Sequence, residues 1–385
     1  MARIVKRDNG KWQARIERVG HPAQSGTFQT KAAASAWARA IEREMDTGSF
    51  INRDDAERTT FGDAAARYER EVLPSKRGAA QDRMRLARLV EQFGKYSLAS
   101  ISSSKIAEFR DERSKAVSAQ TVVHELGLIS RVFKACAMDW GIALPQGIPT
   151  ALVRKPKIAN ARERRLEAGE EALLLGALRE CKTPWPAAAF VLAIETAGRQ
   201  GELLSLQWKE VDLKRKTARL RGRDGGPTKS GADYRDVPLS SAAVALLEGL
   251  PRNLRGKVLP LSQNALQLSY ERAIQRGRQS HIHGLLKTRL LAKGMDQKGV
   301  DQEICSLIFK KKDPLPSTLE VLADIEAHDG TLQNLTFHDL RHEATSRLAG
   351  KLAMHALMKV TGHASSRMVS RYYHPRAEDL ALMLG

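Results

Sequence analysis

The stretch Phe337-His338-Asp339-Leu340-Arg341-His342 places a histidine and an arginine three residues apart near the end of a 385-residue chain. Residues at positions i and i+3 of a helix share one face, and apolar residues recurring at every fourth position favour a helix here. Gly362-His363 follow, and Tyr372 lies nine residues beyond that histidine. These histidines, the arginine and the tyrosine form the centre of a candidate site.

A second arginine lies far upstream, in Thr196-Ala197-Gly198-Arg199-Gln200-Gly201-Glu202-Leu203-Leu204-Ser205-Leu206. In a phosphoryl transfer, negative charge gathers on non-bridging oxygens, which planar guanidinium groups meet with paired hydrogen bonds. Arg199 and Arg341 suit that role. A tyrosine hydroxyl has an ordinary pKa of about 10, so at neutral pH it attacks well only beside cations and a base. We expect His338 to be that base.

In this order and spacing, the residues resemble those of the tyrosine recombinases, the integrases of phages and other mobile elements. The resemblance implies that Tyr372 is the nucleophile rather than the adjacent Tyr373. Both the family's spacing from His363 and the preceding Arg371 select it. Successive helical residues point about 100° apart, so only one of the two tyrosines can face the arginines.

The same resemblance implies catalytic roles for Lys229 and His363 and supporting roles for Glu202 and His342. The leaving 5′-oxygen needs a proton, and the family carries a catalytic lysine in a β turn, which Lys229 in Thr228-Lys229-Ser230-Gly231 matches. His363 is expected to donate a hydrogen bond to a phosphate oxygen. Glu202 is expected to orient an active-site cation, Arg199 or another. His342 is expected to be either a site residue or a packing and support residue.

The reaction implied by the resemblance is strand exchange without metal, ATP or any other cofactor. Tyr372 attacks a phosphodiester, forms a 3′-phosphotyrosyl bond and releases a 5′-hydroxyl, and the partner strand reverses these steps. Two duplexes need four active sites. The implied assembly is therefore a homotetramer on DNA, built by exchange of C-terminal segments such as Ala377 to Gly385.

Composition agrees with a nucleic-acid partner. A formal net charge of +19 and a sequence pI near 10.0 imply a polyanion. Because the sequence has no apolar run of membrane length, we expect double-stranded DNA rather than a bilayer. Cys136, Cys181 and Cys305 lie far apart, which argues against a zinc knuckle and a disulfide framework. The start of the chain lacks a signal-peptide pattern, so we expect a cytoplasmic, nucleoid-associated protein.

The predicted fold is multidomain and mainly α, with small β-sheets. In residues 1–52, three strand-like segments and a helix from Lys31 to about Asp46 resemble the arm-type DNA-binding domain of integrases. Lys11, Gln13 and Arg15 could read base edges or hold phosphates from one face of that sheet.

The middle of the chain predicts a helical core-binding (SAM-like) domain at 58–152. Its helices are expected near 60–72, 80–93, 103–115 and 118–140, with Thr60 and Asp63 forming a capping box and Gly141 ending the last. A basic linker at 153–165 follows, and its cations are expected to track phosphates. These are Arg154, Lys155, Lys157, Arg162, Arg164 and Arg165.

Residues 166–385 predict a mixed α+β catalytic domain, with strands in 217–220 and 234–239 around the turn that carries Lys229. An insertion at about 277–333 departs from the family pattern. It is either a tolerated surface excursion, because long insertions cost little free energy, or a contact with DNA or a neighbouring protomer.

Finer likenesses separate the candidate functions. Short segments are similar to the shufflon-type invertases, namely Trp140-Gly141, Leu152 to Lys157, Arg164 to Leu166 and His342 to Ala344. Those enzymes do not usually carry an arm-binding sheet, which favours an integrase of a prophage or integrative element, with accessory bending or excision proteins. A DNA invertase, a type IB topoisomerase and a catalytically inactive DNA-binding regulator are the alternatives. A metal-dependent nuclease would need clustered carboxylates, for which we find no convincing arrangement.

Overall fold

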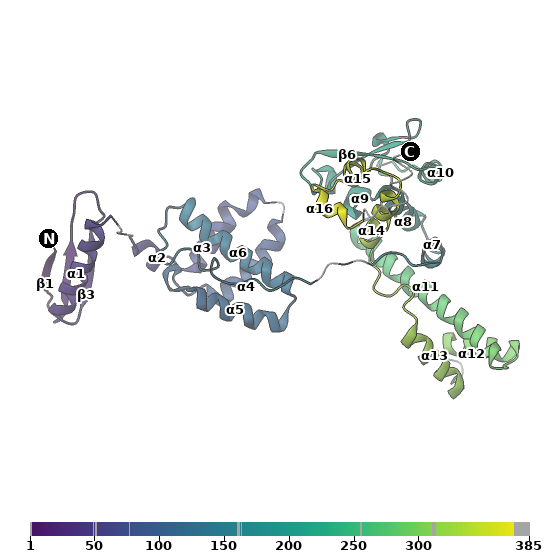
Figure 1. The fold of residues 1–385 in the computed structure, drawn as a ribbon, viewed down its shortest axis with the longest axis horizontal. Coiled ribbons are helices and arrows are strands. Elements are labelled where there is room, and N and C mark those ends of the chain that lie inside the picture. The colour runs from purple at the N-terminus through teal and green to yellow at the C-terminus, as the bar shows by residue number, and fades with distance from the viewer. Residues whose placement is uncertain are drawn as a thin grey trace, which may run out of the picture. The chain divides into compact units, whose positions relative to one another are not determined.

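The computed structural model describes residues 2–48, 50, 52–76, 78–159, 162, 164–254, 256–309 and 313–372. The chain divides into two compact units, Met1–Ala161 and Arg162–Gly385, and each is described by itself (Figure 1). Within the described residues, no helix combines the length and the apolar character needed to cross a membrane.

The first unit begins with an antiparallel sheet of β1 (Arg3–Lys6), β2 (Trp12–Ile16) and β3 (Gln24–Phe28), followed by α1 (Lys31–Asp46). These elements lie where the sequence predicts them. Side chains alternate along β2, so Ala14 and Ile16 are buried in a small core with α1, and Gln13 and Arg15 occupy the other face. Lys11 precedes β2 and is exposed.

The helical part of this unit contains α2 (Asp54–Arg58), α3 (Phe61–Glu71), α4 (Ala79–Phe93), α5 (Ser103–Ala116) and α6 (Ala119–Met138). The predicted capping box is present: the Thr60 side chain accepts from the Asp63 amide, and the Asp63 carboxylate accepts from the Thr60 amide. Gly141 has φ +67° after the last helix. Phe61, Phe93 and Phe133 are central to the core.

The second unit begins with α7 (Glu170–Arg179), α8 (Trp185–Thr196) and α9 (Gln200–Ser205). An antiparallel sheet of β4 (Val211–Asp212), β5 (Thr217–Arg221) and β6 (Tyr234–Pro238) follows, and then α10 (Ser241–Gly249). Alternation divides this sheet into an inner face, with Leu220, Arg235 and Val237 buried, and an outer face that carries Arg219 and Asp236.

Three helices complete the core of the second unit: α14 (Asp339–Ala349), α15 (Met354–Thr361) and α16 (Ser366–Ser370). Helix α14 packs against α8, and α15 lies beside β6 (Figure 1). The apolar cluster that joins them includes Phe190, Leu203 and Leu340. This packing brings the ends of α8 and α15 close to the inner face of the sheet.

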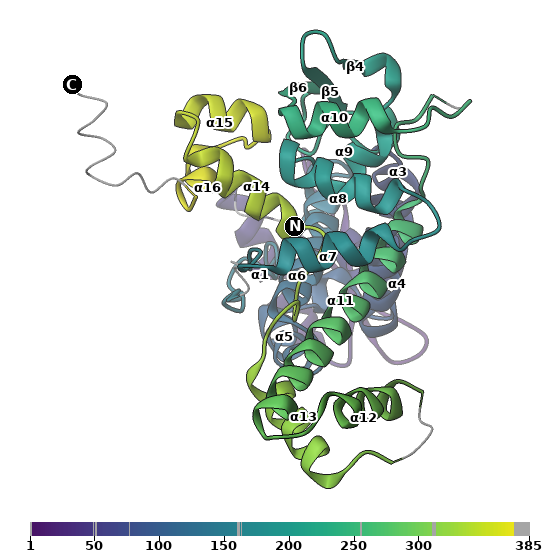
Figure 2. The ribbon, with the colours of Figure 1, turned by 90° about the vertical axis from the view of Figure 1, so that its right-hand side faces the viewer.

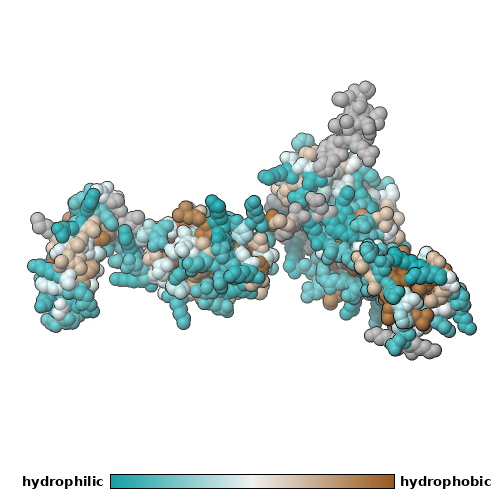
Figure 3. All heavy atoms as spheres, turned by 60° about the horizontal axis from the view of Figure 1, so that its bottom comes forward, coloured by the Kyte–Doolittle hydropathy of each residue, from teal (hydrophilic) through white to brown (hydrophobic). Residues whose placement is uncertain are grey.

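The predicted insertion forms a helical projection of α12 (Gln297–Phe309) and α13 (Pro316–His328) on the second half of α11 (Gln263–Ala292) (Figure 2). The predicted start of the insertion, at about 277, falls inside this long helix. The helix continues because Ile282, Leu286 and Leu290 recur at every fourth position and form a separate apolar cluster with α12 and α13. Figure 3 shows apolar side chains on the surface of this projection, where Phe309 and Leu315 are exposed.

Candidate active site

Arg199 occupies the N-cap position of α9. Ala197 adopts a left-handed conformation with φ 50° at the end of α8, which breaks the helix and leaves Arg199 extended. The Arg199 guanidinium donates to Oε1 of Glu202 at 2.7 Å, and its backbone amide donates to Oε2 at 3.1 Å. Glu202 therefore fixes both the backbone and the side chain of Arg199.

Glu202 is only 2% exposed, and it also binds an arginine that the sequence analysis missed. Nη2 and Nε of Arg235 donate to Oε2 of Glu202 at 2.7 and 3.2 Å. Arg235 lies on the inner face of β6, in register with the apolar Val237 two residues later. The sequence does hold a signal for Arg235, because it is a charged residue on the otherwise apolar face of a predicted strand.

Arg341, near the start of α14, is buried between the C-terminal ends of two helices. Its guanidinium donates to the carbonyls of Ala197, after α8, and of Thr361, the last residue of α15. Carbonyls at helix C-termini lack intrahelical partners and carry partial negative charge, so they stabilise a buried cation. Arg341 thereby connects Ala197 and Thr361, which lie 144 and 20 residues from it in the sequence.

Positive charge exceeds negative charge in this cluster. The charges acting on Arg341 are those of Arg199, Arg235 and Glu202, together with Tyr372. Burial, followed by the two neighbouring guanidinium groups, lowers the pKa of Arg341 to about 9, so it stays charged at neutral pH. These residues comprise three arginines and one carboxylate, an arrangement suited to an anion such as a phosphate.

His363 lies beside Arg341. Its Nδ1 is 2.7 Å from Oγ1 of Thr361, and its Nε2 is 3.4 Å from Nη2 of Arg341. Burial and the charges of Arg341 and Arg199 lower the pKa of His363 to about 3. A neutral ring whose two nitrogens face these groups can hold one proton, and its tautomer decides which nitrogen donates.

Tyr372, the last described residue, follows α16, and its hydroxyl is hydrogen-bonded to Nδ1 of His342. The tyrosine ring centre is 5.6 Å from that of His342 and 6.4 Å from that of His363. The sequence analysis favoured His338 as the base, whereas the structure places His342 in contact with the hydroxyl. Burial, followed by the charges of Arg371 and Arg341, lowers the pKa of His342, so its ring is neutral and can accept the tyrosine proton.

His338 precedes α14 and stacks edge to face on His342, with ring centres 5.2 Å apart. Partial desolvation of the ring, followed by the charges of His342 and Arg341, lowers the pKa of His338 to about 4. Lys229, exposed in the turn between β5 and β6, also acts on His338 through its charge. Lys229 is therefore close enough to the cluster for its cation to influence it.

Two linker arginines have partners inside the second unit, and their role in tracking phosphates stays a prediction. Arg162 donates to Oδ1 of the buried Asp339 at 2.7 Å, and Arg164 donates to the buried Glu170. Buried carboxylates outcompete solvent for these guanidinium groups because an unpaired buried charge is costly. The other four linker cations predicted to bind DNA are exposed: Arg154, Lys155, Lys157 and Arg165.

The rival tyrosine, Tyr373, and the predicted exchanged segment Ala377 to Gly385 lie outside the described part of the chain. Within the described residues, no group of three or more histidine, cysteine, aspartate or glutamate side chains is arranged to hold a metal ion.

Comparisons with known proteins show the family and the fold. The chain is 30% identical to the shufflon-specific DNA recombinase of Escherichia coli over 299 residues, which are 77% of this chain and 62% of that protein. Two solved structures share the fold. The Tn1549 transposon integrase with transposon right end DNA has a TM-score of 0.58, 16% identity and coverage of 85% of this chain and 98% of that one. A lambda integrase dimer bound to a COC′ core site has a TM-score of 0.57, 18% identity and coverage of 97% and 95%.

The sequence pattern of the phage integrase family matches residues 164–305 and 311–379, which include every candidate catalytic residue named above. The match covers more than half of the chain, and the arginines, histidines and tyrosine that it spans meet in one cluster. The chain therefore belongs to the phage integrase family of tyrosine recombinases.

Proposed function

We propose that this protein is a site-specific DNA recombinase that cuts and rejoins DNA through a 3′-phosphotyrosyl intermediate, without metal or ATP. The observation that carries the proposal is the cluster itself. Tyr372 lies beside His342 and His363, next to arginines whose combined charge exceeds that of Glu202. A scissile phosphate would supply the missing negative charge.

The cleavage step follows from these positions. The Tyr372 hydroxyl oxygen attacks the phosphorus, the bond to the 5′-oxygen breaks, and the tyrosine becomes linked to the 3′-phosphate. Arg199 and Arg341 stabilise the charge that develops on the non-bridging oxygens, and His363 donates a further hydrogen bond. The ester bond energy is retained in the phosphotyrosyl link, so the reverse step needs no nucleotide.

Two protons move during cleavage. The hydroxyl of Tyr372 is hydrogen-bonded to Nδ1 of His342. In the tautomer whose Nδ1 carries no proton, His342 is the first proton acceptor, with His338 stacked behind it. Lys229 gives a proton to the leaving 5′-oxygen. Its support is the exposed position of its side chain in the turn between β5 and β6 and the effect of its charge on His338. In rejoining, each transfer runs backwards.

We propose that the protein acts on attachment sites of a prophage or integrative element, as a homotetramer on double-stranded DNA in the nucleoid. The N-terminal sheet, with Gln13 and Arg15 on its open face, would bind additional arm sites, and accessory bending or excision proteins would shape the complex. Support comes from the lambda integrase tetramer bound to a Holliday junction, which shares the fold with a TM-score of 0.57.

A DNA invertase is the second candidate, favoured by the 30% identity to the shufflon-specific recombinase. Integration at attachment sites and DNA inversion differ in their need for the N-terminal sheet. Deleting residues 1–52 should spare cleavage of a single site in both cases. The deletion should impair recombination only if arm sites take part. Recombination is therefore measured on plasmids that carry paired sites with and without flanking DNA, which distinguishes an integrase from an invertase.

The chemistry is tested on a duplex selected from a random library by binding to the Tyr372→Phe variant and then nicked near the cleavage position. We expect the wild-type protein to form a covalent adduct, seen on a denaturing gel with no metal added, and Tyr372→Phe to bind equally and form none. Specific binding without any wild-type adduct would contradict the proposal and indicate a DNA-binding regulator.

A further inference from the structure

We propose that Arg235 is a positioning residue for the two arginines assigned to the scissile phosphate. It acts by locking Glu202 and the C-terminal end of α15 into one rigid frame. This inference rests on the proposed recombinase function. It assigns to Arg235 a role in cleavage without a contact to DNA.

The contacts of Arg235 join three segments of the second unit. From β6, its guanidinium donates to Glu202 on α9, to the carbonyl of Ala197 after α8 at 3.2 Å, and to the carbonyl of Val360 on α15. The side chains of Arg235 and Glu202 are 7% and 2% exposed. A buried pair of this kind, with its remaining donors satisfied by carbonyls, has one well-defined geometry.

These contacts act directly on both phosphate-binding candidates. Glu202 is shared between Arg235 and Arg199, so the position of Arg235 determines where the carboxylate holds Arg199. The Ala197 carbonyl is shared between Arg235 and Arg341. Arg341 then binds Thr361, the residue after the one that Arg235 binds. Both arginines thus clamp the ends of α8 and α15 together.

The backbone beside Arg235 is shaped to admit its side chain. Gly362 has φ +66°, and a Cβ built there would lie 2.9 Å from Cδ of Arg235. The glycine is required both for its left-handed conformation and for this close approach. The next residue, His363, is thereby placed against Arg341.

Arg235 itself is not positioned to bind the phosphate. Its described contacts use Nε and both terminal nitrogens on Glu202 and two carbonyls, and Tyr372 and the histidines are not among them. Arg199 differs because its side chain is 19% exposed and can reach a substrate while it holds Glu202. Arg341 is buried as Arg235 is, but it differs because it contacts His363 and the charge of Tyr372 acts on it. We therefore keep the term positioning residue for Arg235.

The experiment compares Arg235→Met and Arg235→Lys with Arg219→Met, a matched control on the adjacent strand whose guanidinium lies on the outer face and pairs with Asp236. Each full-length protein is given the nicked duplex described above in two forms. One has a normal scissile phosphate. The other has a methylphosphonate, in which a methyl group replaces one non-bridging oxygen and removes the charge. Cleavage rate and DNA affinity are measured separately.

We expect Arg235→Met to slow cleavage of the normal phosphate by about 10- to 100-fold, because small displacements of catalytic groups have effects of that size. DNA affinity should stay within about threefold of wild type. On the methylphosphonate, the ratio of wild-type to variant rates should fall below about threefold, because a neutral phosphorus centre depends less on the arginines. Arg235→Lys should lie in between, and Arg219→Met should match wild type on both substrates.

Three results would overturn the inference. The first is a cleavage rate of Arg235→Met or Arg235→Lys equal to that of wild type. The second is a defect of equal size on the two substrates, which would indicate general loss of structure. The third is a loss of DNA affinity that parallels the loss of rate. If Arg235→Met fails to fold, the two-substrate comparison with Arg235→Lys decides the question. A wild-type protein that forms no adduct would instead contradict the proposed function.

Discussion

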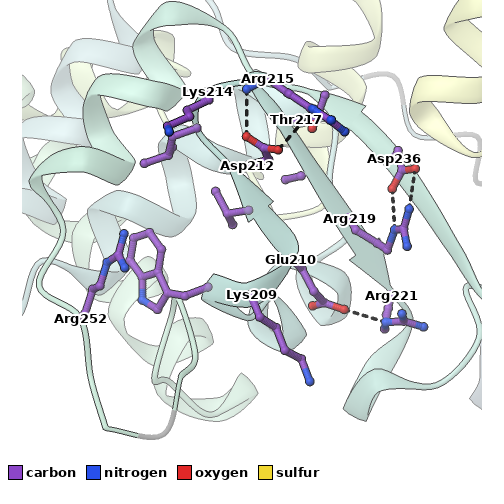
Figure 4. Close-up of a pocket in the computed structure, with 14 residues that line it drawn as sticks. Lys209, Glu210, Asp212, Lys214, Arg215, Thr217, Arg219, Arg221, Asp236 and Arg252 are labelled. Carbon is purple, nitrogen blue, oxygen red and sulfur yellow. Dashed lines mark hydrogen bonds and ion pairs between the residues drawn. The ribbon is translucent and has the colours of Figure 1, made fainter.

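Each face of the β4–β5–β6 sheet carries an arginine that pairs with a carboxylate, and the faces differ in how far these pairs are exposed to solvent. On the inner face, Arg235 pairs with Glu202, and both side chains are almost fully buried. On the outer face, Arg219 pairs with Asp236 at 2.8 Å, and Arg221 pairs with Glu210 (Figure 4). The outer pairs line an open cleft of about 730 Å³, and the Arg219 and Asp236 side chains are 41% and 52% exposed.

Consecutive residues of one strand, Arg235 and Asp236, therefore enter opposite environments. A buried pair cannot exchange its partner for water, so each member depends on the other and holds its geometry. An exposed pair is screened by solvent and contributes little. The difference shows that ion pairs organise the candidate site only where burial removes the alternative of hydration.

The largest effect on the inner side should come from Arg341→Ala. We expect cleavage of the nicked duplex to fall by at least about 10²- to 10³-fold, as when one donor to a transition-state oxygen is removed. DNA affinity should change far less. The matched control is Arg347→Ala on the same helix, whose side chain is 40% exposed and pairs with Glu343. An equal loss of cleavage rate in Arg341→Ala and Arg347→Ala would contradict the distinction between buried and exposed arginines.

Glu202→Gln should reduce stability more than Asp236→Asn does. Removing the buried carboxylate leaves Arg199 and Arg235 without their anion, which should lower the free energy of unfolding by about 3 kcal/mol. Asp236→Asn should cost less than about 1 kcal/mol, because its partner remains hydrated. Urea unfolding of the full-length proteins measures both. A smaller loss for Glu202→Gln than for Asp236→Asn would refute the reasoning.

The smallest effect should be the coupling across the outer pair. A double-mutant cycle with Arg219→Ala and Asp236→Asn should give a coupling energy below about 1 kcal/mol. It should shrink further in 0.5 M salt, where the Debye length falls to roughly 4 Å. A coupling energy that did not change with salt would show that the outer pair behaves as a buried pair does.

Local patterns predicted most of the elements. Capping and periodicity predicted the capping box at Thr60 and helices α1 and α3 to α6, because those signals depend on neighbours in sequence. The family's spacing similarly selected Tyr372, Arg199, Arg341 and His363, which the fold brings into one cluster. Their catalytic roles stay predictions.

Distant contacts account for what the sequence did not predict. The partners of Arg235 lie 33 and 125 residues away, and its role becomes visible only when the strand register is known. Similarly, the choice between His338 and His342 depends on where Tyr372 lies after α16. The ion pair of Arg162 could not be predicted because its carboxylate partner, Asp339, is 177 residues away and buried.

Helix α11 takes part in two separate apolar clusters. Its first half contributes Leu266 and Tyr270 to the core behind the candidate site, and its second half contributes Ile282 and Leu286 to the projection. Thirty residues of helix form a rod of about 45 Å, given a rise of 1.5 Å per residue. Helix α11 would therefore act as a lever. A sideways force on the projection would exert a torque on the catalytic core.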